Sequence, residues 1–265
     1  MIPDPLLHVA LWGLESTVGS DLMKLADKRI VLTGGTSGIG WELARRLCRD
    51  NQLVVLSRKS ARLDRLRSEL PGVEVLEVDL ADSGQVVSCA NLLAERYEQI
   101  DLLINNAAVQ FTPTFQDADF DFDSIAREIA VNFTSPCQLI AKLMPSLEKA
   151  PRAMIVNVNS GLGLVPKTSS AVYCGTKGGL NIFSQALANQ LEGSSVTVKQ
   201  VFLPLVDTAM TSGRGTGKLS AGGAAERIIK GIEGRQDQID IGKVSLLRLI
   251  NRLSPLLAAN IMKKA

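Results

Sequence analysis

Residues 29–40 read R-I-V-L-T-G-G-T-S-G-I-G, and this stretch decides the fold. Its first four residues predict a short apolar strand, and the apolar stripe that begins at Ile39 predicts a helix. Glycines between them let the backbone approach a pyrophosphate, and the amides at the helix start favour its charge. A glycine cluster alone is usually a plain turn, but this context favours dinucleotide binding. The turn residues predicted to hold the cofactor are Gly34, Thr36, Ser37, Gly38, Ile39 and Gly40.

The end of the second strand bears on the choice of cofactor. An acidic residue there would accept hydrogen bonds from both ribose hydroxyls and favour NAD(H), but residues 51–63 contain none. Arg58 instead offers a forked cation suited to a 2′-phosphate. The sequence therefore favours NADP(H) over NAD(H). The alternative interpretation is a solvated arginine in a basic loop.

The next two strands end in residues that suit an adenine and its surroundings. Asp79 can accept a hydrogen bond from the adenine amine while Leu80 packs on the ring, although capping of a helix by Asp79 or Asp82 is the alternative. After the following strand, the turn N-N-A-A places Asn106 and Ala107 beside the predicted cofactor. Asparagine side chains in such a turn can tie strand ends together, and alanines leave room for a ligand.

Residues 160–177 carry the candidate chemistry. Tyr173 and Lys177 are four residues apart at the start of a predicted helix, so they share one face. A free phenol has a pKa of about 10. A nearby ammonium is expected to lower the pKa of Tyr173 and make it a usable acid and base. Ser160 ends an apolar run, so its hydroxyl is expected at the carboxyl end of a strand, where open α/β sheets place ligands.

Composition excludes several classes of protein. A chain of 265 residues with 46% hydrophobic content fits one large α/β domain, and a net charge of +2 does not favour nucleic acid as a partner. Four scattered cysteines predict free thiols in a reducing, cytoplasmic compartment. His8 is the single histidine, which argues against Ser–His hydrolysis and against a metal site. No run reaches the roughly 18 apolar residues of a membrane span.

The chain divides into three parts. Residues 1–27 are expected to form an extension packed on the domain or on a sister subunit, and residues 28–242 form the main domain. The apolar tail, 243–265, is expected to pack on the core or a partner, with membrane-surface contact as the alternative. The glycine-rich loop 213–223 lacks Walker spacing and is interpreted as a lid over the substrate. Pro136 predicts a kink inside a long helix.

The order of these motifs resembles the short-chain dehydrogenase/reductase family from about Lys28 to Ile241. The matching pieces are T-G-G-T-S-G-I-G at 33–40, Asp79-Leu80, N-N-A-A at 105–108, Asn132, Ser160 and Y-C-G-T-K at 173–177. The resemblance implies a single Rossmann-like, doubly wound α/β domain. Its sheet would have about seven mostly parallel strands with helices on both faces. It also implies a nicotinamide cofactor.

The resemblance further implies a Ser-Tyr-Lys-Asn tetrad. Tyr173 would protonate a carbonyl oxygen or deprotonate an alcohol, and Lys177 would lower the pKa of Tyr173 and bind the nicotinamide ribose. Ser160 would hold the substrate oxygen, and Asn132 would hold a water in the proton relay. From its position alone, Asn132 is a mid-helix asparagine of the kind that usually serves packing or hydrogen bonding.

After the sixth strand, Pro204, Val206 and Thr208 match positions that face the cofactor in this family, the last two beside the nicotinamide carboxamide. Two residues depart from the family pattern. Ala108 replaces a glycine and is tolerable if its backbone is not left-handed, whereas Leu205 replaces a glycine and is expected to narrow the pocket or shift the loop. The 204–208 string and the tail are similar to bacterial reductases of teichoic-acid D-alanylation loci.

The sequence thus predicts an NADP(H)-dependent oxidoreductase that moves a hydride between nicotinamide and a carbonyl or secondary alcohol, acting as a ketone or aldehyde reductase. Apolar residues at 162–165 and 203–210 favour an aliphatic or ring ketone. The family likeness implies a homodimer or homotetramer paired through helices equivalent to 124–147 and 170–191. The alternative is a non-catalytic NADP(H)-binding sensor or scaffold on the same fold.

Overall fold

The computed structural model describes residues 23–112 and 114–263, and it contains a parallel sheet of seven strands in the order β3-β2-β1-β4-β5-β6-β9. These strands are β1 (Arg29–Thr33), β2 (Gln52–Ser57), β3 (Glu74–Glu77), β4 (Leu102–Asn105), β5 (Ala153–Ser160), β6 (Val196–Leu203) and β9 (Gln238–Asp240). The strand order reverses between β1 and β4, and open α/β sheets bind ligands outside such a reversal. The predicted doubly wound fold is confirmed.

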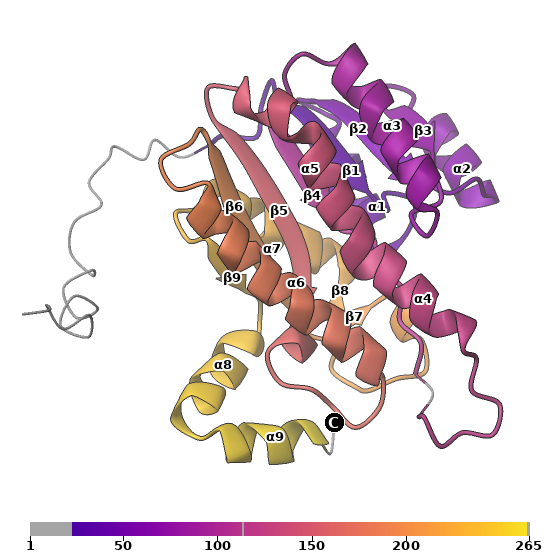
Figure 1. Ribbon diagram of the computed structural model, residues 1–265, viewed down its shortest axis with the longest axis vertical. Helices are drawn as coiled ribbons and strands as arrows, with labels where there is room; N and C mark the ends of the chain where they lie inside the picture. The colour runs from indigo at the N-terminus through magenta and orange to yellow at the C-terminus, as the bar shows by residue number, and fades with distance from the viewer. Residues whose placement is uncertain (1–22, 113, 264–265) are drawn as a thin grey trace, which may run out of the picture.

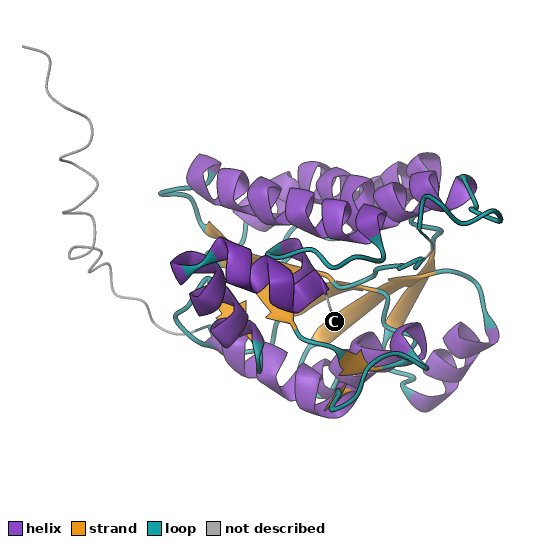
Figure 2. Ribbon diagram, turned by 90° about the horizontal axis from the view of Figure 1, so that it is seen from below, coloured by secondary structure: helices purple, strands orange, loops and turns teal. Residues whose placement is uncertain are grey.

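Helices cover both faces of the sheet, as Figure 2 shows. One face carries α1 (Gly38–Leu47), α2 (Ala61–Glu69) and α7 (Ala221–Glu233); the other carries α3 (Ser83–Arg96), α4 (Asp123–Ile129), α5 (Ser135–Glu148) and α6 (Ala171–Gln190). The last two helices, α8 (Val244–Leu253) and α9 (Pro255–Lys263), lie beyond the carboxyl ends of the strands (Figure 1). Within the described residues, no helix combines the length and apolar character that a membrane crossing requires.

The core consists of two apolar layers separated by the sheet. In β1, Leu32 belongs to the layer under α1 and α7, whereas its neighbour Val31 belongs to the layer under α3 and α5. Successive side chains of a strand point to opposite faces, so a strand covered on both sides must be apolar at every position. This is why the sequences of the strands are continuous apolar runs. Packing on both faces of the sheet holds the carboxyl ends of the strands in place along one edge.

Two local features differ from the sequence-based expectation. The predicted helix over 124–147 is divided into α4, a π-helical turn over Ala130–Thr134, and α5, so the irregularity precedes Pro136, which lacks the N–H that a regular helix needs. The loop 213–223 is shorter than expected, because β8 (Leu219–Ser220) pairs with β7 (Val206–Asp207) and α7 follows at once. His8 and residues 1–22 of the expected N-terminal extension lie outside the described residues.

Candidate active site

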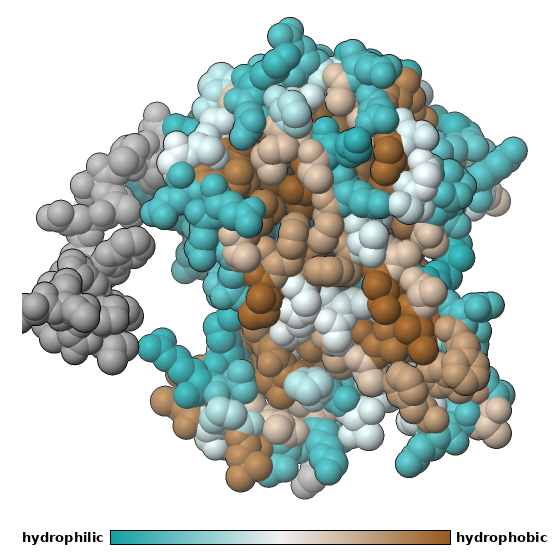
Figure 3. Space-filling view, in the orientation of Figure 1, coloured by the Kyte–Doolittle hydropathy of each residue, from teal (hydrophilic) through white to brown (hydrophobic). Residues whose placement is uncertain are grey.

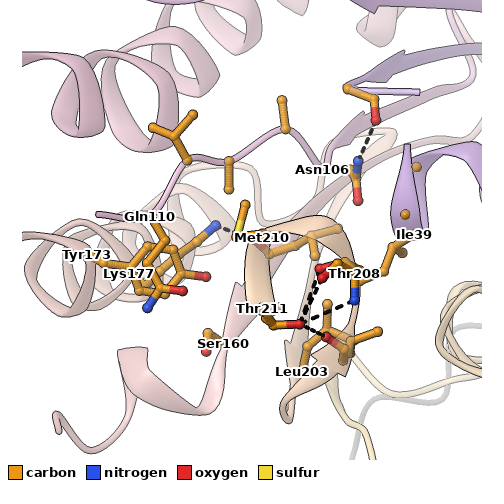
Figure 4. Close-up of a pocket in the computed structure, with 18 of the residues that line it drawn as sticks. Ile39, Asn106, Gln110, Ser160, Tyr173, Lys177, Leu203, Thr208, Met210 and Thr211 are labelled. Atoms are coloured by element: carbon orange, nitrogen blue, oxygen red, sulfur yellow. Dashed lines mark hydrogen bonds between the residues drawn. The ribbon is translucent and has the colours of Figure 1, made fainter. Parts of the chain in front are cut away.

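A cavity with a volume of about 1420 Å³ lies at the carboxyl edge of the sheet. Small-molecule sites usually measure roughly 300–1,000 Å³, so this cavity has room for a dinucleotide and a second molecule. Every residue predicted for cofactor binding or catalysis lines it, except Asn132. In the view of Figure 4, Tyr173, Lys177 and Ser160 lie together on one side of the cavity, with Ile39, Asn106 and Thr208 on the other.

The glycines of the turn are packed so closely that none of the three described below has room for a side chain. A methyl group added at Gly40 would lie 1.9 Å from the carbonyl oxygen of Gly34, and Gly34 itself has a φ of +73° that favours glycine. Gly38 has a φ of +53°, and an added methyl there would lie 2.9 Å from the Thr208 side chain. The turn therefore brings bare backbone and the start of α1 to the cavity, which fits a pyrophosphate.

Asn106 holds this turn against the end of β4. Its Nδ2 donates to the carbonyl oxygens of Thr33 at 3.0 Å and Gly34 at 3.2 Å. The backbone N–H groups of Asn106 and Ala107 both donate to Oγ1 of Thr33 at 3.0 Å. The predicted tie between strand ends is confirmed. Among the described non-glycine residues, positive φ occurs at Asp27 and Ser170 and not at Ala108, so Ala108 fits without strain.

At the end of β2, the cavity is bordered by three exposed cations, Arg58, Lys59 and Arg62. Within the described part of the chain, no salt bridge pairs any of them with an acid. Unpaired cations at the strand end that faces an adenosine ribose are suited to a phosphate on the 2′-oxygen. The residues present therefore fit NADP(H).

Asp79 and Leu80 both line the cavity beyond β3. Asp82, rather than Asp79, caps α3 by accepting the backbone N–H of Gln85, so the capping interpretation holds for Asp82. The carboxylate of Asp79 accepts the N–H of Ala81 and lies 3.4 Å from Arg127. Asp79 thus presents a carboxylate at the cavity wall, and its contact with an adenine amine stays a prediction.

The candidate catalytic groups come from β5 and α6. Ser160 is the last residue of β5, and Tyr173 and Lys177 lie in the first two turns of α6. Nζ of Lys177 donates to the carbonyl oxygen of Val158 at 2.8 Å and lies 5.8 Å from the centre of the Tyr173 ring. The Ser160 hydroxyl is near enough to the Tyr173 side chain to lower the pKa of its phenol. A phenol, an alcohol and an ammonium thus meet at one wall of the cavity.

The electrostatics of this group differ from the sequence-based expectation. Burial raises the pKa of Tyr173 to about 12, and the nearby Ser160 hydroxyl offsets only part of that effect. Burial also lowers the pKa of Lys177 to about 8. The expected net lowering of the Tyr173 pKa is wrong for this structure, because loss of hydration favours the neutral form of the phenol and outweighs the effects of nearby charges and polar groups. Tyr173 is therefore a protonated phenol at neutral pH.

Asn132 lies in the π-helical turn and does not line the cavity. Its Oδ1 accepts the N–H of Val109 at 2.8 Å, and its Nδ2 donates to the Val109 carbonyl at 2.8 Å and to Oγ1 of Thr176 at 3.3 Å. The side chain fastens the segment after β4 to α6, one residue before Lys177. The interpretation of Asn132 as a hydrogen-bonding residue of the core is confirmed, and its role in a proton relay stays a prediction.

The segment after β6 reaches the cavity as expected. Pro204, Val206 and Thr208 all line it, and Thr208 caps a 3₁₀ turn over Ala209–Thr211. The Leu205 side chain is 40% exposed and packs on the backbone of Gly215, where an added methyl would lie 2.5 Å from it. Leu205 therefore contacts the glycine-rich loop as well as the cavity, and a glycine at 215 makes room for it.

Some residues that line the cavity or support its wall have no signature in the sequence. Ser170 adopts a φ of +63° just before α6, and its Oγ accepts a hydrogen bond from Gln110 at 3.2 Å. A strained serine in the turn before Tyr173 has no local sequence marker. Lys167 and Arg214 line the cavity from two loops, and the tail predicted to pack on the core supplies an apolar wall. The tail residues in this wall are Val244, Leu246, Leu247, Ile250, Ile261 and Met262.

Comparisons with known proteins agree with this geometry. Residues 28–218 match the family model for short chain dehydrogenases. The uncharacterized oxidoreductase DltE of Bacillus subtilis (strain 168) is 36% identical over 189 residues, covering 71% of this chain and 75% of its own.

Two solved structures share the fold. A short chain dehydrogenase from Burkholderia cenocepacia J2315, in complex with NADP, matches with a TM-score of 0.81 and 22% identity, covering 91% of this chain and 99% of that one. A short chain dehydrogenase/reductase from Burkholderia phymatum, in complex with NAD, matches with a TM-score of 0.77 and 21% identity, covering 88% and 96%. The two neighbours differ in cofactor.

Proposed function

The chain belongs to the short-chain dehydrogenase family, and from this premise we propose that it is an NADP(H)-dependent reductase of ketones or aldehydes. The observation that carries the proposal is the meeting of Ser160, Tyr173 and Lys177 on one side of a cavity that the glycine turn also lines, with Ile39 of that turn on the other side in Figure 4. When bound, the nicotinamide supplies a hydride to the carbonyl carbon. The chain's own groups supply the proton and hold the oxygen.

Tyr173 is the proposed proton donor. Because burial keeps its phenol protonated at neutral pH, Tyr173 is ready to give a proton to the carbonyl oxygen as that oxygen gains negative charge. The Ser160 hydroxyl hydrogen-bonds to the same oxygen and stabilises it. The ammonium of Lys177, held by the Val158 carbonyl, stabilises the phenolate that Tyr173 becomes. This protonation state favours reduction over alcohol oxidation.

The pH dependence of the reaction should reflect Lys177 rather than Tyr173. With a pKa of about 8, Lys177 loses its positive charge as the pH rises through that value, whereas Tyr173, with a pKa of about 12, stays protonated. We expect kcat/KM for reduction to be constant at neutral pH and to fall above pH of about 8. Stopped-flow assays over a pH series measure this, with NADPH binding followed at each pH as the control. A rate that rises through the same range would contradict the assignment.

The cofactor preference rests on Arg58. Removing its guanidinium in Arg58→Ala should weaken NADPH binding by about tenfold or more and leave NADH binding little changed, because a hydrogen bond to a charged group is lost only with NADPH. Fluorescence titration with both cofactors measures the two affinities. Arg235→Ala removes an exposed arginine outside the cavity and is the matched control. Equal losses for NADPH and NADH in Arg58→Ala would count against the preference.

Self-association is also proposed. Ile129 on α4 and Ile182 on α6 are exposed, and Figure 3 shows apolar side chains gathered on the face formed by these helices and α5. Burial of such a face against a second copy would remove apolar surface from water. We expect a dimer or tetramer that Ile182→Glu dissociates, as measured by sedimentation velocity. Leu92→Glu places the same charge at an exposed leucine on α3 and should leave the assembly intact.

The proposed compartment is the reducing cytoplasm. All four cysteines are free, and two of them, Cys89 and Cys174, are buried. Free thiols persist where glutathione and thioredoxin keep them reduced.

The proposed substrate has an apolar body, because the tail helices α8 and α9 line the cavity with aliphatic side chains.

A further inference from the structure

Two cations stand beside the proposed catalytic tyrosine without a role in the reaction described above. Lys167 lies in the loop between β5 and α6, and Arg214 lies in the glycine-rich loop. Both line the cavity and both are half-buried. Burial lowers the pKa of Lys167 and the nearby charge of Arg214 lowers it further, while the same charge slightly offsets the rise in the pKa of Tyr173, so all three groups share one region of the cavity.

Neither cation has an acidic partner within the described residues. The salt bridges of the described chain include neither Lys167 nor Arg214, although the nearby Lys218 is paired with Asp207 at 3.6 Å. The acid that acts on Tyr173 is Glu128, which is 2% exposed, accepts the N–H of Phe111 and does not line the cavity. Two cations that line one region of the cavity without an acid beside them form a site that favours an anion.

The balance of charge along the cavity wall points the same way. Among the described residues that line the cavity, Asp79 is the single acid, and it is already paired with Arg127 at the adenine side. The lining cations are Arg58, Lys59, Arg62, Arg127, Lys167, Lys177, Arg214 and Lys243. The cations near Arg58 are accounted for by a cofactor phosphate, but Lys167 and Arg214 lie at the opposite, catalytic side.

We propose that Lys167 and Arg214 bind an acidic group, a carboxylate or a phosphate, on the substrate of this enzyme. This inference rests on the proposed function and defines its substrate class: a carbonyl compound with an acidic group near the reacting carbon and an apolar body. The acidic group would lie between the two cations, and the apolar body would contact the wall formed by α8 and α9. A forked guanidinium and an ammonium together suit either anion.

The test measures binding of three matched probes to the protein saturated with NADP⁺: octanoate, octyl phosphate and the neutral octanamide. Isothermal titration calorimetry in a buffer free of phosphate and sulfate gives each affinity. We expect at least one acid to bind about tenfold or more tightly than octanamide, because its charge pairs with both cations. The octanoate and octyl phosphate arms show which acidic group is preferred.

The double variant Lys167→Gln/Arg214→Gln should abolish the preference for the acid. The matched control is Arg227→Gln/Lys230→Gln, which removes the same charge from exposed positions on α7 outside the cavity and should keep the preference. NADPH titration of each variant reports its folding. A preference that survives in the first double variant, equal binding of acid and amide by the wild type, or no acid binding at all would overturn the inference.

The same titrations, together with an assay of ketone reduction, separate this inference from the proposed function. If the wild type binds NADPH and reduces neutral ketones but shows no preference for acids, the anion site is wrong and the reductase proposal stands. If the wild type does not bind NADPH, the proposed function itself fails.

Discussion

Replacing Tyr173 with phenylalanine is expected to lower kcat/KM for carbonyl reduction by about 10²–10⁴-fold, the usual contribution of a positioned general acid. The substitution removes one oxygen atom and leaves the buried ring in place, so packing is nearly conserved. Ser160 can still hydrogen-bond to the substrate oxygen but has no proton of suitable acidity to give it. We expect NADPH affinity to change much less than the rate, because the glycine turn and Arg58 are untouched.

The chain offers a matched control for this experiment, because it has one other tyrosine. Tyr97 lies at the end of α3, where its hydroxyl contacts Glu74 far from the cavity. Tyr97→Phe removes the same atom and should leave kcat/KM for reduction unchanged. A Tyr173→Phe enzyme that reduces ketones at the wild-type rate would remove Tyr173 from the mechanism.

Replacing Gly40 with alanine is expected to abolish tight cofactor binding. The new methyl group would lie 1.9 Å from the carbonyl oxygen of Gly34 and 2.7 Å from Nδ2 of Asn106, which itself holds that carbonyl. The clash is with backbone, so the turn and the start of α1 must move apart. We expect NADPH to bind at least about a hundredfold more weakly, about 2.7 kcal/mol, and the protein to be less stable by about 1–3 kcal/mol.

Fluorescence titration with NADPH and thermal unfolding measure the two effects of Gly40→Ala. Gly72→Ala is the control, since a methyl group there has no neighbour within 4 Å. If Gly40→Ala binds NADPH as tightly as the wild type, the glycine turn is not the pyrophosphate site.

The parts of the fold that depend on residues close together in the sequence could be predicted from it. Strand β1, the glycine turn and α1 follow one another without interruption, so their apolar pattern and glycine spacing are visible within residues 29–47. The same holds for Ser160 at the end of β5 and for the helical spacing of Tyr173 and Lys177. Each prediction required only which strand end or helix turn a residue occupies.

The pKa of Tyr173 could not be predicted in this way. The four-residue spacing indicates a nearby ammonium, and that ammonium is present, but burial of the phenol depends on elements from the whole chain. Loss of hydration is the largest effect, so the pKa of Tyr173 is raised where the spacing alone predicts that it is lowered. Spacing gives the partner of a titratable group, whereas its hydration is a property of the folded protein.

Lys167 and Arg214 escaped prediction for a related reason. They lie 47 positions apart in two loops without apolar periodicity, so only tertiary structure brings them to one cavity.

The C-terminal tail could be predicted in part. Its apolar stripe predicts packing, but not that one side of α8 and α9 faces a ligand cavity. The π-helical turn before Pro136 is similar, since proline marks an irregularity without specifying its form.

Transfer of deuterium from C4-deuterated NADPH to a panel of ketones, followed by mass spectrometry of the alcohols, tests the central claim most directly. The glycine turn and Tyr173 both line the cavity, and Figure 4 shows Ile39 of that turn on the other side of it from Tyr173, so a cofactor held by the turn can reach a carbonyl beside Tyr173. We predict that the wild-type enzyme delivers one deuterium to the carbonyl carbon from one face, and that Tyr173→Phe delivers it far more slowly. Tight NADPH binding with no deuterium in any alcohol would contradict the reductase function and favour a protein that only binds the cofactor.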